Sequence, residues 1–122
     1  MPQLLRLYGI PNCDTVKAAR RWLDSAQVPY EFHDFKKAGV PPAELDKWMA
    51  RLGWERLLNK QSSTWRKLDE STRDKTKTSA GAKALMLEQP TLIKRPVVDA
   101  DGELSLGFDP SSFEMRFNTP LG

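Results

Sequence analysis

The spacing of apolar residues predicts a strand, a helix and a second strand in the first third of the chain. Residues 4–8 are mostly apolar and are predicted to form a short buried strand. Apolar residues then return at steps of three and four, the spacing of one helix face: Val16, Ala19, Leu23 and Ala26. Residues 30–35 begin with alternation and are predicted to form the second strand. This order predicts two parallel strands joined by a right-handed crossover.

The middle of the chain, residues 41–89, is predicted to be a helical block without strands. Pro42 suits the first position of a helix and Gly53 its end. One stripe between them is apolar: Leu45, Trp48, Met49 and Leu52. A shorter helical piece is expected over residues 54–58.

Polar stretches separate these helices. Residues 36–42 are predicted to be a connection, because they include glycine and two prolines. Residues 69–78 carry charges and hydroxyl groups with almost no apolar side chain, and are predicted to be a solvated, mobile loop. Thr64 and Ser79 are predicted to cap the helical segments on either side of it.

The last third returns to strands and closes on a helix. Apolar segments at residues 97–98 and 104–106 flank Asp101-Gly102, a dipeptide typical of a tight hairpin turn. We therefore expect two antiparallel strands. Asp109 suits the N-cap of a final helix and Pro110 its first position.

Composition is that of an ordinary globular protein. The 122 residues suffice for a core that needs no disulfide or structural metal, so we expect a single domain over residues 1–122. No apolar run approaches the ~20 residues of a membrane span and no signal pattern begins the chain. We therefore expect a cytoplasmic protein without a membrane partner.

The charged and metal-ligating residues narrow the function further. The net charge of +3 is too balanced to favour nucleic acid, although it suits an anionic ligand. One cysteine and one histidine are too few for a typical metal site, so we expect none. The histidine, His33, is predicted to be a surface or packing residue.

The single cysteine, Cys13, lies where the first strand gives way to the helix. Asn12 suits the N-cap and Asp14 the first turn, so Cys13 is expected at a helix N-terminus. Backbone N–H groups and the helix dipole there lower a thiol pKa by favouring the thiolate. Asp14 opposes this effect and Lys17 supports it. Cysteine is also often buried without a chemical role, so both interpretations stay open at this point.

The residues around Cys13 resemble a motif of a known family. Residues 8–22, Y-G-I-P-N-C-D-T-V-K-A-A-R-R-W, resemble the N-terminal motif of the glutaredoxin-coupled arsenate reductase (ArsC) family. The resemblance is strongest to its YffB branch, a sister group of the Spx transcription regulators. Further similar segments follow in the same order, at residues 53–55, 57–60, 64–68, 92–97 and 107–109. Together they extend over nearly the whole chain.

This resemblance implies an α/β, thioredoxin-like fold with a four-stranded mixed sheet. Its order would be β-α-β, a helical insert over about residues 41–89, and β-β-α. It also implies a cis peptide bond at Arg95-Pro96, beside the cysteine loop. Arg95 would then point toward Cys13 and offer its guanidinium to an oxyanion or carboxylate. The alternative is an exposed arginine with a solvated head.

The chain departs from the arsenate reductases at the cationic groups around the cysteine. Those enzymes are expected to hold the oxyanion with three arginines, and Arg95 matches the second. The first falls where this chain has Asn59 and Lys60, and the third falls within residues 106–109, which hold no arginine. With Lys60 as a partial substitute, we expect weak arsenate binding.

A thioredoxin-like redox site usually has two cysteines spaced C-x-x-C, but Val16 stands at the second position here. An outside thiol such as glutathione must then resolve any oxidised Cys13. The resemblance therefore implies a glutathione-dependent monothiol reductase, with Cys13 as nucleophile and Arg95 as its catalytic partner.

The expected ligands and partners follow from this hypothesis. Residues expected to bind substrate or glutathione are Asn12, Asp14, Lys17, Lys60, Arg95 and Pro96. Glutathione is the expected co-substrate without any bound cofactor, glutaredoxin is a second candidate partner, and the substrate would be a small oxyanion or a disulfide. Two alternatives stay open: a glutaredoxin-coupled arsenate reductase, and a non-catalytic Spx-like regulator that binds RNA polymerase.

Overall fold

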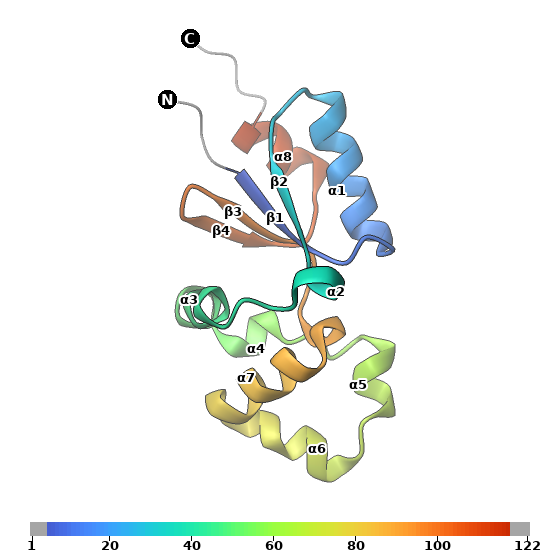
Figure 1. The fold of residues 1–122 in the computed structure, drawn as a ribbon, viewed down its shortest axis with the longest axis vertical. Coiled ribbons are helices and arrows are strands. Elements are labelled where there is room, and N and C mark those ends of the chain that lie inside the picture. Colours follow the sequence, from blue (N-terminus) through green and yellow to red (C-terminus); the bar gives the residue numbers. More distant parts are fainter. Residues whose placement is uncertain (1–4, 118–122) are drawn as a thin grey trace. The chain divides into compact units, whose positions relative to one another are not determined.

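The structure, a computed structural model, describes residues 5–117 in two compact units (Figure 1). The sheet unit runs up to Asp34 and resumes at Arg95, and the helical unit comprises Phe35–Lys94. The sheet unit contains β1 (Leu5–Gly9), α1 (Asp14–Ser25), β2 (Glu31–Asp34), β3 (Val97–Ala100), β4 (Glu103–Leu106) and α8 (Pro110–Phe117). The helical unit contains α2 (Phe35–Ala38), α3 (Pro42–Leu52), α4 (Trp54–Leu57), α5 (Ser63–Lys67), α6 (Glu70–Asp74), η1 (Lys75–Lys77), α7 (Ser79–Glu88) and η2 (Pro90–Leu92), where η marks a 3₁₀ helix. The expectation of one domain over residues 1–122 stays a prediction.

Four strands in the order β2-β1-β3-β4 form the sheet. β1 is parallel to β2 and antiparallel to β3, and β3 is antiparallel to β4. The parallel pair requires a crossover, which α1 supplies. The hairpin turn is made by Asp101 and Gly102, whose φ angles of 54° and 94° are both positive. The predicted four-stranded mixed sheet is confirmed.

One face of the sheet packs against α1 and α8. The buried residues of this face are Leu5, Leu7, Val98 and Ala100 from the strands, Ala19 and Leu23 from α1, and Phe113 from α8. The rings of Trp22 and Phe113 meet edge to face at a centroid distance of 5.6 Å. Because side chains alternate along a strand, Arg6 and Tyr8 of β1 belong to the opposite face.

The helical unit is organised around the apolar stripe of α3. Leu45 and Trp48 of this stripe are fully buried, and its other two predicted members are half-buried. The Phe35 ring packs against Trp48 at a centroid distance of 6.2 Å. α3 ends at Gly53, where φ is 87°, so the predicted helix bounds are confirmed.

The predicted connection over residues 36–42 is wrong in part, because Phe35–Ala38 forms the short helix α2. β2 accordingly ends at Asp34. The Phe35 ring is buried within the helical unit instead of extending the alternation of β2. Phe35 follows Phe32 by three residues, which breaks the period of two of a strand, so the end of β2 before Phe35 could have been predicted from the sequence.

The prediction of a mobile loop over residues 69–78 is wrong, because the helices α6 and η1 occupy most of this segment. Hydrogen bonds from the hydroxyl and the N–H of Thr72 lower the pKa of the Asp69 carboxyl, which caps α6. The Thr76 hydroxyl donates to the Arg73 carbonyl at 2.6 Å. These contacts between polar side chains and backbone hold the segment without an apolar stripe.

Two predicted N-caps lie slightly too far along the chain. Ser62 rather than Thr64 caps α5, and Thr78 rather than Ser79 caps α7. In both caps the hydroxyl oxygen accepts the N–H of the third residue after it, at 3.1 Å. Asp109 caps α8 as predicted.

Candidate functional site

A tight turn between β1 and α1 positions Cys13. The Cys13 N–H donates to the Ile10 carbonyl at 3.2 Å, and the Cys13 carbonyl accepts the Lys17 N–H at 2.9 Å. A Cβ on Gly9 would lie only 2.7 Å from Cγ2 of Val16, a fully buried residue in the first turn of α1. Glycine at position 9 therefore lets the end of the strand approach the start of the helix.

Cys13 itself is the N-cap of α1, so the prediction that Asn12 caps this helix is wrong. Cys13 has extended backbone angles, with φ −96° and ψ 126°, and Asp14 is the first helical residue. A side chain at the N-cap lies near the N–H groups of the second and third helical residues, which here are Thr15 and Val16. The Cys13 side chain makes no capping hydrogen bond of the usual kind, and the atom that it offers to these donors is a sulfur.

The surroundings of Cys13 lower its pKa. Partial burial alone would raise the pKa of the thiol. Hydrogen bonding from the Val16 N–H, from the Arg95 side chain and from the Thr15 N–H, together with the Arg95 charge, outweighs burial and lowers the pKa below its ordinary value. The predicted position at a helix N-terminus is confirmed, and the half-exposed sulfur is accessible to a reactant.

Arg95 and Pro96 bring a second chain segment to the sulfur. The peptide bond between them is cis, as the resemblance implies. Arg95 is half-buried and its side chain hydrogen-bonds to Cys13, while Pro96 is buried. The Pro96 carbonyl accepts the Gly107 N–H at 2.9 Å, which ties this segment to the end of β4. Cys13, Arg95 and Pro96 are therefore brought together within the sheet unit.

The other predicted binding residues have different surroundings. Asn12, Asp14 and Lys17 are exposed and lie in or beside the first turn of α1, close to Cys13 along the chain. Lys60 is exposed in the helical unit, where its Nζ lies 5.6 Å from the centroid of the Trp65 ring. Their roles in binding stay predictions.

Gly9 is a site residue that the sequence reasoning missed. It is the last residue of β1 and is not among the site residues that the sequence predicts. A glycine that directly follows an apolar strand and precedes a helix is the signal that could have revealed a close approach of the backbone.

A comparison with known proteins gives the family. The sequence profile of the ArsC family matches residues 8–115, which is most of the chain. The chain belongs to the ArsC family. Its fold is the predicted thioredoxin-like α/β arrangement on a four-stranded mixed sheet.

Two solved structures resemble this chain over nearly its whole length. A YffB protein is 43% identical and covers 93% of this chain and 98% of its own, with a TM-score of 0.84. An arsenate reductase (ArsC) related protein of Brucella melitensis is 44% identical and covers 95% and 96%, with a TM-score of 0.74. The predicted similarity to YffB proteins is confirmed.

Curated relatives add the regulator branch. An uncharacterized protein of Haemophilus influenzae is 37% identical over 114 residues, which are 93% of this chain and 99% of the relative. The global transcriptional regulator Spx 1 of Lactococcus lactis is 26% identical over 108 residues, covering 87% and 83%. The relatives of this chain thus include both an arsenate reductase-related protein and a transcriptional regulator.

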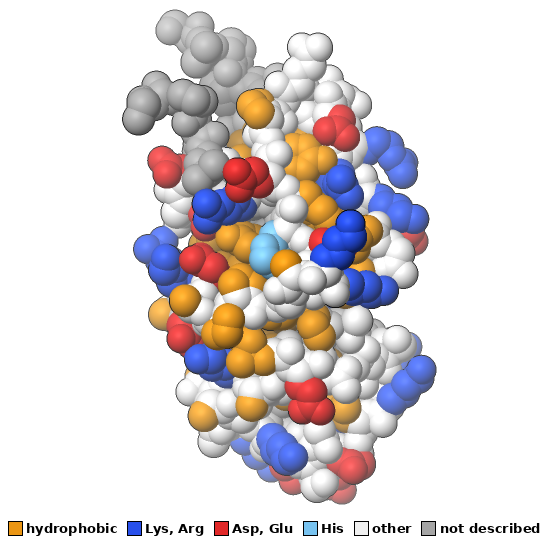
Figure 2. All heavy atoms as spheres, viewed as in Figure 1, with side chains coloured by type: hydrophobic (Ala, Val, Ile, Leu, Met, Phe, Trp, Pro, Cys, Tyr) orange, Lys and Arg blue, Asp and Glu red, His pale blue; other side chains and the backbone are white. Residues whose placement is uncertain are grey.

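The surface adds little to this assignment. On the face shown in Figure 2, Lys and Arg side chains are mixed with Asp and Glu, in keeping with the small net charge of +3. Within residues 5–117, no helix combines the length and the apolar character that a bilayer crossing requires.

Proposed function

We propose that this protein is a glutathione-dependent monothiol reductase with Cys13 as its nucleophile. The observation that carries the proposal is the group of donors around one half-exposed sulfur, formed by two N–H groups of the first turn of α1 and the Arg95 guanidinium. These donors stabilise the thiolate, which is the reactive form of a cysteine.

The proposed reaction is thiol–disulfide exchange in two steps. In the first, the Cys13 thiolate attacks the glutathione sulfur of a mixed disulfide; a Cys13–glutathione disulfide forms and the substrate thiolate departs and takes up a proton. In the second, a glutathione thiolate attacks the glutathione sulfur bound to Cys13, which releases glutathione disulfide and restores the Cys13 thiolate. In sum, one mixed disulfide and one glutathione thiol are converted to the substrate thiol and one glutathione disulfide, so that the substrate sulfur is reduced and one glutathione thiol is oxidised.

The proposal needs an outside thiol because the chain has one cysteine. Val16 occupies the position of a second C-x-x-C cysteine and is fully buried in the first turn of α1. Arg95 would hold a carboxylate of glutathione, and the backbone before Pro96 would pair with the tripeptide. The binding roles of Asn12, Asp14, Lys17 and Lys60 remain part of this proposal.

Arsenate reduction is the second candidate, favoured by the pairing of Arg95 with Cys13 and by the likeness to an arsenate reductase-related protein. Residues 106–109 are Leu-Gly-Phe-Asp and supply no further arginine for an oxyanion. The loss of charge-assisted contacts at that position favours a disulfide over arsenate as substrate.

The deciding experiment measures glutathione oxidation by the purified full chain with a glutathione mixed disulfide, and separately with arsenate plus glutaredoxin. We expect turnover with the disulfide that is abolished in Cys13→Ser and unchanged in Arg21→Gln, which removes an exposed cation from α1. Full activity in Cys13→Ser would overturn the proposal. Faster turnover with arsenate than with the disulfide would replace it by the second candidate.

The likeness to Spx regulators supports a third hypothesis, a non-catalytic regulator. Such a protein is expected to bind RNA polymerase. This hypothesis predicts stable co-purification with polymerase that does not depend on Cys13. The regulator hypothesis replaces the enzyme proposal if neither the disulfide nor arsenate is turned over and the Cys13→Ser variant still co-purifies with RNA polymerase.

A further inference from the structure

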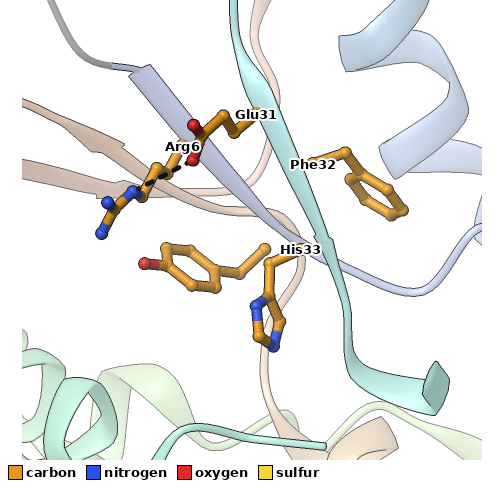
Figure 3. Close-up of a pocket in the computed structure, with 5 residues that line it drawn as sticks. Arg6, Glu31, Phe32 and His33 are labelled. Carbon is orange, nitrogen blue, oxygen red and sulfur yellow. Dashed lines mark ion pairs between the residues drawn. The ribbon is translucent and has the colours of Figure 1, made fainter. Parts of the chain in front are cut away.

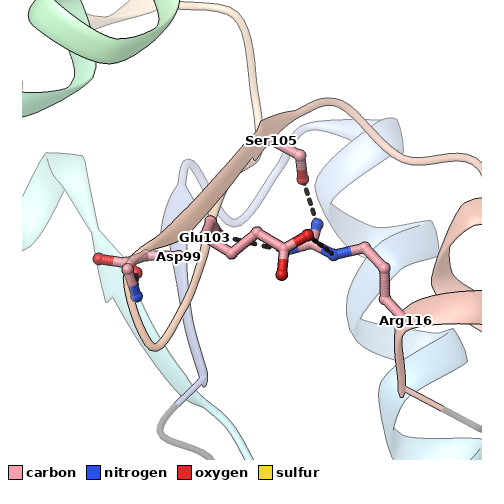
Figure 4. A network of polar contacts seen from close by, with 5 residues as sticks. Asp99, Glu103, Ser105 and Arg116 are labelled. Carbon is pink, nitrogen blue, oxygen red and sulfur yellow. Dashed lines mark hydrogen bonds and ion pairs between the residues drawn. The ribbon is translucent and has the colours of Figure 1, made fainter.

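The two edges of the sheet differ in how they are protected. At β4, the Arg116 guanidinium donates to the Glu103 carbonyl at 3.1 Å and to the Ser105 hydroxyl, and its Nε lies 3.9 Å from the Glu103 carboxylate (Figure 4). A long cationic side chain thus covers this edge strand. Such side chains commonly protect an edge strand from pairing with another chain.

The β2 edge instead has a hollow on each side. A hollow of about 180 Å³ is lined by Arg6, Tyr8, Glu31, Phe32 and His33 (Figure 3). Another of about 450 Å³ is lined by Arg20, Asp24, Val28, Pro29, Tyr30 and Phe32. Figure 3 shows the side chains of Phe32 and His33 directed to opposite sides of the strand. A strand added to β2 would place alternate side chains over the two hollows.

We infer that the partner at this edge is a second copy of this chain, whose β2 pairs in antiparallel with β2 about a two-fold axis at Phe32. The axis places Phe32 opposite the partner's Phe32. It also places Glu31 opposite the partner's His33, and His33 opposite the partner's Glu31. Outside these pairs, Tyr30 lies opposite the partner's Asp34. Each cross-strand pair is thus aromatic or joins a carboxylate to a hydrogen-bond donor.

Charge selects this register over its two neighbours. An axis at Glu31 would place that carboxylate against the partner's Glu31, and like charges directly opposite destabilise a strand pair. An axis at His33 would place Phe32 against the partner's Asp34, so an aromatic ring would face a carboxylate. Pro29 limits the pairing at the other end because it has no N–H to donate.

The side chains around β2 are already ordered for this pairing. On the face toward α1, the Arg20 guanidinium lies 4.2 Å from the Phe32 ring centroid and its Nε donates to the Tyr30 hydroxyl at 3.2 Å. On the other face, the Arg6 guanidinium lies 3.5 Å from the Glu31 carboxylate. The partner's Phe32 would extend the aromatic contact, and the partner's His33 would join the Arg6–Glu31 pair.

Sedimentation equilibrium of the full chain tests the pairing, with variants that swap charge. We expect a concentration-dependent dimer that His33→Glu weakens about tenfold or more, because Glu31 then faces a carboxylate twice per dimer. Combining Glu31→Lys with His33→Glu restores opposite charges and should recover the dimer. Glu88→Lys, an exposed residue at the end of α7, serves as a control with the same charge change as Glu31→Lys. A wild-type chain that stays monomeric overturns the inference, as does a double variant that remains as weak as His33→Glu.

Disulfide cross-linking tests directly whether residue 31 lies opposite residue 33 of the partner. In a Cys13→Ser background, Glu31→Cys and His33→Cys chains are mixed and oxidised. Residues directly opposite on paired strands lie within disulfide range, so the mixture should cross-link faster than either chain alone. Equal rates in the mixture and in the separate chains would overturn the proposed register.

Discussion

The N-termini of α1 and α7 have similar backbones and different cap atoms. Cys13 and Thr78 are both extended N-cap residues, with φ −96° and −116°. Thr78 accepts the Gly81 N–H on an oxygen, which satisfies a donor that the helix leaves unpaired. Cys13 presents a sulfur to the corresponding donors, and its pKa is lowered. One cap position thus stabilises a helix, while the other favours the thiolate form of its side chain.

Exchanging the sulfur for oxygen should have the largest effect. Cys13→Ser should abolish glutathione-dependent turnover, because a hydroxyl at this position remains protonated. It should leave the free energy of unfolding unchanged or raise it by up to ~1 kcal/mol, since serine is a preferred N-cap. Urea unfolding monitored by circular dichroism measures the stability. A loss of 2 kcal/mol or more would show that the sulfur is mainly a packing group.

Removing the cation is expected to have the second-largest effect. Arg95→Ala should raise the pKa of Cys13, because it loses a hydrogen bond and a favourable charge. Turnover should fall about 10- to 100-fold if the guanidinium also binds an anionic substrate. The pH dependence of alkylation by iodoacetamide reports the pKa. Arg21→Gln is the control, and an equal pKa change in that variant would rule out a specific role for Arg95.

Gly9→Ala tests whether the tight turn is required at the sulfur-capped helix. The added Cβ would lie 2.7 Å from the buried Val16 side chain, and relieving this contact should cost about 1–3 kcal/mol in stability. It should also slow alkylation of Cys13, because the first turn must shift. Gly53→Ala is the control. Gly53 has open space around it but a positive φ, so this variant measures the loss of stability when a glycine is replaced without a steric contact.

Thr78→Ala should have a smaller effect, confined to stability. Loss of the α7 cap should lower the free energy of unfolding by about 1 kcal/mol, and Thr78→Ser should restore it. Turnover and the alkylation rate of Cys13 should be unchanged. A drop in turnover equal to that of Arg95→Ala would show that the two caps do not have separate roles.

The smallest effect is a dependence of stability on pH. Since folding lowers the pKa of Cys13, the thiolate adds stability above the pKa of the unfolded chain, and this contribution disappears as pH falls through the folded pKa. The stability of the wild type relative to Cys13→Ser should therefore rise between the folded pKa and the ordinary thiol value near 8.5. Unfolding measured across neutral to alkaline pH checks the sign. A difference that falls over this range would contradict a lowered pKa.

The sequence predicted those parts of the fold that repeat a pattern. The apolar run in residues 4–8, the spacing of Val16, Ala19 and Leu23, and the Asp101-Gly102 turn sufficed for the sheet and its main helix. Residues 69–78 were misassigned because side-chain hydrogen bonds such as Thr76 to Arg73 order them without an apolar period. Caps were misplaced by one or two residues where several capping side chains follow one another.

Prediction of the candidate site combined two kinds of information. The residues on either side of Cys13 and the helix spacing after it predicted a helix N-terminus there, and the family resemblance predicted the cis bond and the direction of Arg95. The close approach of Gly9 to Val16 depends on how two elements pack, which a one-dimensional pattern does not specify.

The cap position of Cys13 also affects how a completed turnover ends. A low-pKa thiolate is a weaker nucleophile than a basic one, but it is a better leaving group from a disulfide. In the proposed cycle, the donors of α1 and Arg95 would therefore assist the departure of Cys13 from glutathione more than its attack. If the proposed cycle operates, the covalent adduct should be short-lived whenever free glutathione is abundant, and trapping it will require glutathione to be depleted.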